Sequence, residues 1–188
     1  MKIIVGITGA TGAHMGWRLI EMLQELGHEA HVVISNWGKE TLLQETGHRV
    51  EELEAMADAY YDNTNLAAAI SSGSYPVDGM VIVPCSMKTL SAVANGYTEN
   101  LVVRAADVTI KERRKLVLVV RETPLSSIHL RNMLSISDTG AVIMPPVLGY
   151  YSGLWDLPSL TDAFLGRVLD QLGIKNPYYR VWGLDVSG

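Results

Sequence analysis

The sequence predicts an α/β fold, a three-layer αβα domain built on a doubly wound parallel sheet. Short runs rich in Ile, Val and Leu alternate with longer segments of helical periodicity along the 188 residues. The first run, residues 2–8, leads through Gly6, Gly9 and Gly12 into a helix and then into a second run at 29–35. This succession completes a βαβ unit, whose two strands lie parallel.

The remaining elements follow the same alternation. We expect further strands at residues 80–83, 116–120 and 141–144. Helices are expected at 15–26, 37–45, 51–57, 100–115, 127–137 and 160–172, and another that opens near Lys88 or Thr89 and runs through Val93. Pro84 has no N–H to donate, so the pairing of the third strand is expected to end there.

Composition narrows the class of protein. The chain is 48% hydrophobic and 19% charged, and no linker divides it, so we expect one globular domain over residues 1–188. A net charge of −5 argues against a general nucleic-acid binder. No apolar run approaches the roughly 20 residues that span a membrane. Cys85 is the single cysteine, which fits a reducing compartment, and a cytoplasmic location is expected.

Four turns should meet at the carboxyl edge of this sheet, after Thr8, Ile34, Val83 and Val120. The glycine turn alone fits NAD, FAD or FMN, or only tight packing between strand and helix. The second strand ends in Ser35-Asn36-Trp37, without the acid that binds a dinucleotide's ribose. The turns therefore favour a mononucleotide, although ordinary exposed strand-to-helix turns explain the polar residues equally well.

Several motifs resemble one known family. They are residues 6–13 (GITGATGA), 71–74 (SSGS), 84–90 (PCSMKTL), 104–108 (RAADV), 111–114 (KERR), 121–125 (RETPL) and 129–134 (HLRNML). In order and spacing, from about Lys2 to Gly173, the chain resembles the flavin prenyltransferases, the UbiX/Pad family, and most of all its members associated with phenolic-acid decarboxylase systems.

The resemblance implies a Rossmann-like fold, bound FMN and a metal-independent reaction. A dimethylallyl group from dimethylallyl phosphate would be joined to N5 and C6 of reduced FMN, giving the cofactor of a UbiD-type decarboxylase. It also implies a homo-oligomer, commonly a dodecamer, and the aromatic residues Trp17, Trp37 and Trp155 in segments expected at the surface favour subunit contacts as well.

The resemblance also assigns site residues, position by position. FMN would contact Gly9, Ala10, Thr11, Ser35, Ser86, Met87, Lys88, Thr89 and Arg121. The allyl phosphate would meet Tyr151 and Arg167, with Arg104 and Lys111 nearby, and the acidic active-site positions would be Glu45 and Glu122. None of the five histidines has metal-ligand spacing, so no metal is expected.

Some features leave alternatives open. The match weakens at residues 147–155, where Leu148, Tyr150 and Leu154 replace Pro, Phe and Pro of the family pattern, which implies a more flexible loop or a different donor. Lys111 to Arg114 could be only a solvated helix end, and Cys85 is expected to be a buried filler rather than a nucleophile. The competing functions are an FMN-dependent cysteine decarboxylase and an FMN carrier without chemistry.

Overall fold

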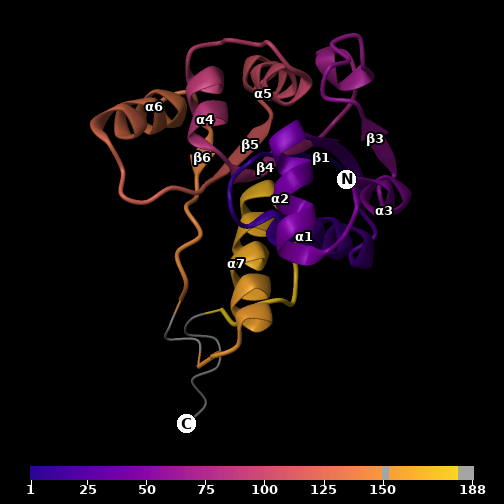
Figure 1. The fold of residues 1–188 in the computed structure, drawn as a ribbon, viewed down its shortest axis with the longest axis vertical. Helices are drawn as coiled ribbons and strands as arrows, with labels where there is room; N and C mark the ends of the chain where they lie inside the picture. The colour runs from indigo at the N-terminus through magenta and orange to yellow at the C-terminus, as the bar shows by residue number, and fades with distance from the viewer. Residues whose placement is uncertain (150–152, 182–188) are drawn as a thin grey trace.

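Six parallel strands form the centre of the molecule (Figure 1). The structure is a computed structural model and describes residues 1–149 and 153–181. The strands are β1 (Lys2–Ile7), β2 (Glu29–Ile34), β3 (Ala59–Tyr61), β4 (Gly79–Cys85), β5 (Lys115–Val120) and β6 (Val142–Ile143). Their order, β3-β2-β1-β4-β5-β6, is that of a Rossmann-like sheet and reverses between β1 and β4, the point where such sheets bind ligands.

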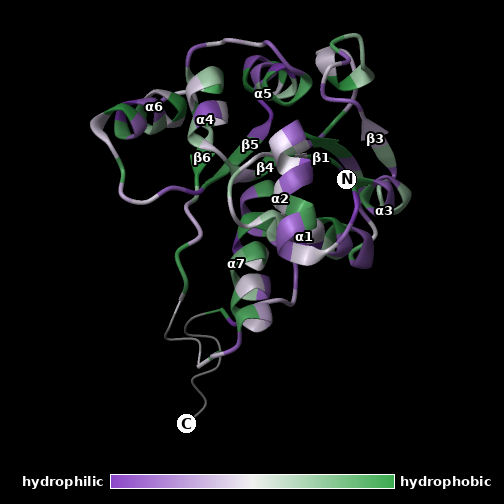
Figure 2. Cartoon of the chain, in the orientation of Figure 1, coloured by the Kyte–Doolittle hydropathy of each residue, from purple (hydrophilic) through white to green (hydrophobic). Residues whose placement is uncertain are grey.

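Helices cover both faces of the sheet. One face carries α1 (Ala13–Glu25), α2 (Asn36–Thr46), α3 (Val50–Met56) and α7 (Leu157–Leu172), and the other carries η1 (Ala69–Ser71), α4 (Met87–Ala94), α5 (Leu101–Lys111) and α6 (Ser127–Ser137). Each face of the sheet has its own core, the first against α1, α2, α3 and α7 and the second against η1, α4, α5 and α6. Neighbouring residues of β1 point to opposite faces, so Ile3 packs in the first core and Ile4 in the second. Figure 2 shows apolar strands between helices that are polar on their outer sides. The predicted three-layer fold is confirmed.

Pairing in β4 continues past Pro84, so the prediction that it ends there was wrong. After a shift in register following Ile82, Cys85 pairs with Val120. The Pro84 carbonyl also accepts hydrogen bonds from the backbone N–H of Thr8 (3.2 Å) and from its hydroxyl (2.8 Å). Proline removes only a donor, and its oxygen remains free to tie β4 to the turn after β1.

Three other features of the secondary structure differ from the prediction. The short edge strand β3 was not predicted, and three residues are too few to give an alternating pattern. The helix expected over 100–115 ends at Lys111, because Arg113 turns the backbone with φ 58° and Lys115 already begins β5. Helix α7 begins at Leu157 rather than at residue 160. Asp156 is its N-cap, and the Asp156 side chain accepts a hydrogen bond from the backbone N–H of Ser159 (2.8 Å).

Candidate functional site

Backbone hydrogen bonds fasten the four predicted turns to one another at the carboxyl edge. The N–H of Ser35 donates to the Ile7 carbonyl (2.9 Å), and that of Ser86 donates to the Thr8 hydroxyl (2.9 Å). The N–H of Arg121 donates to the Cys85 carbonyl (3.1 Å). The turns after β1, β2, β4 and β5 therefore lie side by side, as parallel pairing requires.

Two of the predicted hydroxyls begin helices there. The Ser35 hydroxyl accepts from the N–H of Gly38 (3.1 Å) at the start of α2, and the Ser86 hydroxyl accepts from the N–H of Thr89 (3.3 Å) at the start of α4. Both helices thus direct their N-termini toward the carboxyl edge. The unpaired N–H groups and partial positive charge of helix N-termini suit an anionic group such as phosphate.

The glycine turn brings the start of α1 to the same place. A Cβ on Gly9 would lie 2.3 Å from the Cβ of Trp37, so only glycine fits against α2. Gly12 has φ 107°, a conformation that side chains strain, and it precedes the first residue of α1. Between them, the N–H of Ala10 donates to the Thr8 carbonyl (2.8 Å), which closes the turn.

Glu45, from the last turn of α2, fills the N-terminus of α1 with its carboxylate. It accepts from the N–H of Gly12 (2.8 and 3.0 Å), from the N–H of Ala13 (2.8 Å) and from the Thr11 hydroxyl. Burial raises the pKa of Glu45, but the bonds from Thr11, Gly12 and Ala13 outweigh it, and the pKa lies below its ordinary value. The structure therefore joins an acidic residue assigned to catalysis with the glycine turn assigned to FMN.

A cavity of about 360 Å³ opens beside this carboxylate. The first turn of α1, the first half of α7 and the segment after β6 all contribute residues to its lining. The cavity is mostly apolar, and its charged residues are Glu45 and Arg121. Its lining consists of Thr11, Gly12, His14, Met15, Glu45, Arg121, Pro146, Leu148, Leu157, Thr161 and Phe164. Within residues 1–149 and 153–181, the Arg121 side chain has neither a hydrogen bond nor an ion pair.

Sequence reasoning missed part of this lining. His14 lies with its Nδ1 3.7 Å from the Glu45 carboxylate, and no motif marked it. Leu157, Thr161 and Phe164 stand at helical spacing on α7. That spacing was visible in the sequence, but the helix was expected to begin after Leu157, and periodicity alone does not distinguish a cavity wall from a packed core.

The predicted cations on α5 lie elsewhere. Arg104 donates to the Ser71 carbonyl (3.2 Å) and pairs with Asp107 (2.9 Å), and Lys111 pairs with Glu112. Because α5 leads into the first residue of β5, its last residue, Lys111, lies toward the amino edge of the sheet, opposite the cavity. Neither residue lines the cavity of its own chain.

Other predicted residues lie near the edge without entering the cavity. Lys88 is 82% exposed and pairs with Glu99 (3.2 Å), and half-buried Met87 packs on the second core. The Glu122 carboxylate accepts only from the N–H of Thr123 (3.1 Å) in the described part of the chain. Arg167 is 53% exposed and contacts Asp170 (2.7 Å) and the Tyr179 hydroxyl (3.1 Å).

Tyr151 and the altered Tyr150 lie outside the described residues. Cys85 is fully buried, and burial raises the pKa of its thiol to about 12, which favours the expected filler over a nucleophile. The described residues contain no group of three or more metal-ligating side chains. Nor do they contain a helix long and apolar enough to cross a membrane.

Comparisons with known proteins identify the family of the chain. Residues 1–163 match the Flavoprotein family. The flavin prenyltransferase PAD1, mitochondrial, of Saccharomyces cerevisiae is 50% identical over 96% of this chain and 75% of the yeast protein. A crystal structure of AnUbiX (PadA1) in complex with FMN and dimethylallyl pyrophosphate has 45% identity and a TM-score of 0.94, covering 96% of both chains.

Two further structures define the likeness. A dodecameric FMN-dependent UbiX-like decarboxylase from Escherichia coli O157:H7 has 48% identity and a TM-score of 0.94, covering 97% of this chain and 99% of that one. The FMN-dependent cysteine decarboxylase TvaF has only 14% identity and a TM-score of 0.65, covering 92% and 98%, so it shares the fold alone. The chain belongs to the flavoprotein family and, within it, to the UbiX-like flavin prenyltransferases.

Proposed function

We propose that this chain is a flavin prenyltransferase that joins a dimethylallyl group from dimethylallyl phosphate to reduced FMN. The observation that carries the proposal is the cavity at the carboxyl edge, where Arg121, which has no partner among the described residues, lies beside an apolar wall of α7. An allylic phosphate has the same two parts, an anion and a short apolar group. Both parts find matching chemistry there.

The turns at the carboxyl edge fit FMN. Its phosphate and ribityl hydroxyls would be held by the backbone of Gly9 and Ala10, by the N-termini of α2 and α4, and by the hydroxyls of Thr11, Ser35, Ser86 and Thr89, with Met87, Lys88 and Arg121 beside them. Bound reduced FMN supplies two nucleophilic atoms, N5 and C6, which the family resemblance assigns to the new bonds. A Cβ on Gly9 would clash with Trp37, so the glycine lets the turn after β1 pack against the start of α2.

The donor phosphate needs cations when the allylic C–O bond breaks, because negative charge then collects on its oxygens. Arg121 lies in the cavity with no partner among the described residues. We assign Arg167, Tyr151, Arg104 and Lys111 to the same phosphate. Arg104 and Lys111 lie on α5, away from their own cavity, so this assignment requires that they reach the site of a neighbouring copy.

Two carboxylates are assigned to proton transfer. Glu45 lies in the cavity, and hydrogen bonds hold its pKa below the ordinary value, so its carboxylate is ionised at neutral pH. Glu122 stands in the turn after β5, next to Arg121, and its carboxylate is exposed toward the carboxyl edge. We assign the two residues to the proton that leaves the flavin ring on closure.

The oligomeric state and the protein that receives the product are part of the same proposal. The E. coli relative is described as dodecameric, and Trp37 and Trp155 of this chain are 75% and 80% exposed, as residues of a subunit contact are before assembly. We propose a homo-oligomer, a dodecamer by analogy, whose product passes to a UbiD-type decarboxylase in the cytoplasm. Light scattering tests the assembly, and a monomer at micromolar concentration contradicts it.

The experiment that tests the function is a mass spectrum of the flavin. The protein is incubated anaerobically with reduced FMN and either dimethylallyl phosphate or the diphosphate, since the AnUbiX structure holds the diphosphate. The proposal expects a flavin heavier by one five-carbon group. Unchanged FMN that remains bound supports the carrier alternative, and decarboxylation of a cysteine-ended peptide supports the decarboxylase alternative.

A further inference from the structure

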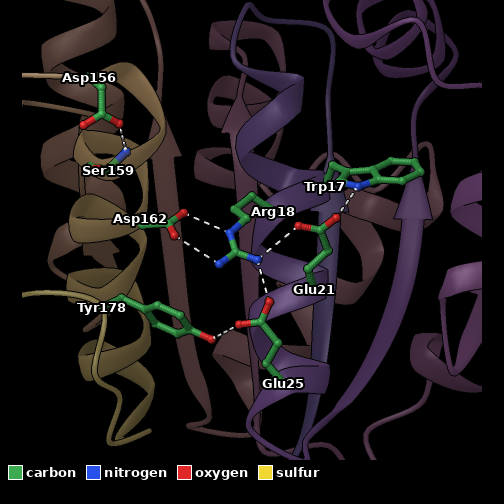
Figure 3. Close-up of polar contacts among 8 residues, drawn as sticks. All are labelled: Trp17, Arg18, Glu21, Glu25, Asp156, Ser159, Asp162 and Tyr178. Atoms are coloured by element: carbon green, nitrogen blue, oxygen red, sulfur yellow. Dashed lines mark hydrogen bonds and ion pairs between the residues drawn. The ribbon is translucent and has the colours of Figure 1, made fainter.

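Arg18 joins α1 to α7 (Figure 3), and both helices contribute residues to the lining of the cavity. From the middle of α1, its Nε lies 2.9 Å from Oδ1 of Asp162 on α7, and its Nη2 lies 3.0 Å from Oδ2. This is a bidentate contact between a planar guanidinium and a carboxylate, the arrangement that fixes both distance and orientation.

The pair joins α1 to the half of α7 that lines the cavity. The second half of α7 is anchored by Leu165, Val168 and Leu169, all fully buried in the core. The first half exposes Leu157, while Thr161 and Phe164 are buried and line the cavity, and Phe164 also packs in the core. In the described part of the chain, Arg18–Asp162 is the only ion pair between α7 and another helix.

The surroundings of Arg18 keep it charged and oriented. Its Nη1 also contacts Glu21 (3.1 Å) and Glu25 (2.7 Å) on its own helix. Tyr178 from the C-terminal segment donates to Glu25 and places its ring 5.6 Å from the guanidinium. The hydrogen bond with Asp162 makes the largest contribution to raising the pKa of Arg18. Only the contact with Asp162 crosses between the two cavity walls, and it lies next to Thr161 in the lining.

We propose that Arg18 is a positioning residue whose pair with Asp162 sets the width of the donor cavity and so favours a five-carbon allylic donor over longer ones. The proposal rests on the proposed function. An apolar pocket discriminates between chain lengths only as far as its walls resist displacement. The first half of α7 is the wall that this pair holds in place.

Asp162→Asn is the informative variant. Removing Arg18 would leave the carboxylates of Glu21, Glu25 and Asp162 close together without their cation, and such a protein could fail to fold. Asp162→Asn removes the charge from α7 and leaves Arg18 paired with Glu21 and Glu25. Arg18→Lys is the second variant, because lysine keeps the charge but lacks the fork. Glu21→Gln is the matched control, since it loses an Arg18 contact that stays within α1.

Two measurements test the proposal. The first is calorimetric titration of dimethylallyl phosphate and geranyl phosphate, a ten-carbon analogue, into the protein loaded with oxidised FMN, which does not react. The second is KM and kcat for both donors with reduced FMN. In Asp162→Asn we expect the affinity for dimethylallyl phosphate to fall on the order of tenfold, with kcat at saturation little changed. The preference over geranyl phosphate should narrow by a similar factor. Arg18→Lys should lie between, and Glu21→Gln should match the wild type.

A uniform loss of kcat for both donors, or an unchanged preference in Asp162→Asn, would overturn the proposal, because a merely structural role moves both donors alike. The wild-type assay separates the two levels of inference. If the wild type makes no prenylated flavin, the proposed function fails. If it does and the variants keep wild-type donor preference, only the role of Arg18 fails.

Discussion

The turns at the carboxyl edge and helix α5 carry two parts of the predicted site, and only the residues of the first part line a common cavity in the described chain. At the edge, hydrogen bonds tie the turns to one another, and Glu45 and Arg121 share one cavity. On α5, Arg104 and Lys111 contact their own helix and the loop at Ser71. Lys111 is ten residues beyond the start of α5, about 15 Å along a helix.

The difference follows from topology. Parallel strands bring every strand-to-helix turn to the same edge of the sheet, so the parallel arrangement alone places residues of these turns near one another. A residue at the far end of a helix that leads back to the next strand must lie at the opposite edge. Under the proposed assignment Lys111 therefore serves the site of another copy of the chain, and assembly becomes part of the proposed mechanism.

Glu45→Gln should have the largest effect, because it removes one of the two charged groups that line the cavity. We expect prenyl transfer to slow on the order of 10²–10⁴-fold, as for general acid–base groups, while FMN remains bound through the other turns. Single-turnover formation of prenylated FMN measures this. Glu40→Gln, exposed on the same helix, is the control. A wild-type rate in Glu45→Gln would mean that Glu45 only caps the N-terminus of α1.

Mixing inactive variants tests whether the two parts of the site come from different copies. Oligomers assembled from Glu45→Gln and Lys111→Ala chains should regain part of the activity that each lacks alone, because some sites then combine an intact edge with an intact α5. Glu45→Gln mixed with Arg121→Ala should regain none, since both residues line the same cavity of one chain. Equal results from the two mixtures would contradict the proposal that Lys111 acts at the site of another copy of the chain.

Arg167→Ala tests whether Arg167 contributes to binding of the donor. We expect FMN binding to stay intact and the KM for the donor to rise on the order of tenfold or more, because a lost charge-assisted hydrogen bond costs roughly 1.5–3 kcal/mol. The assay is product formation against donor concentration, with Arg131→Ala as an exposed control on α6. Wild-type donor dependence would leave Arg167 as a partner of Asp170 and Tyr179 only.

The lowered pKa of Glu45 makes stability depend on pH. A depressed carboxyl pKa contributes stability above the unfolded value, 4.5, and loses it as pH falls through the folded value. The urea midpoint of the ligand-free wild type should therefore exceed that of Glu45→Gln at pH 7, and the gap should close as pH falls below 4.5. A gap that stays constant over that range would mean that the carboxylate is not held by the donors of α1.

Ser86→Ala should have the smallest effect, on stability. Loss of the cap at the start of α4 should cost about 1 kcal/mol. Lys88→Ala, two residues on and 82% exposed, should change stability by less than about 0.5 kcal/mol because surface pairs contribute little. Chemical denaturation compares them. Equal losses would show that the turn is not held through its cap.

Much of the fold was predictable because its signals are local. Apolar runs, glycines at 6, 9 and 12 and helical periodicity give five of the six strands and the parallel arrangement. The meeting of Ser35, Ser86 and Arg121 follows from that arrangement alone. The family resemblance then named residues such as Glu45, whose chemistry no local pattern reveals.

The tertiary structure decided what depends on distance across the fold. It placed Glu45 at the start of α1, brought α7 opposite α1 and paired Arg18 with Asp162, residues 144 positions apart. It also showed that Pro84 does not end β4 and that Lys111 lies away from the cavity of its own chain. The physical reason is that periodicity fixes which face of an element is apolar, whereas packing between elements decides which side chains meet.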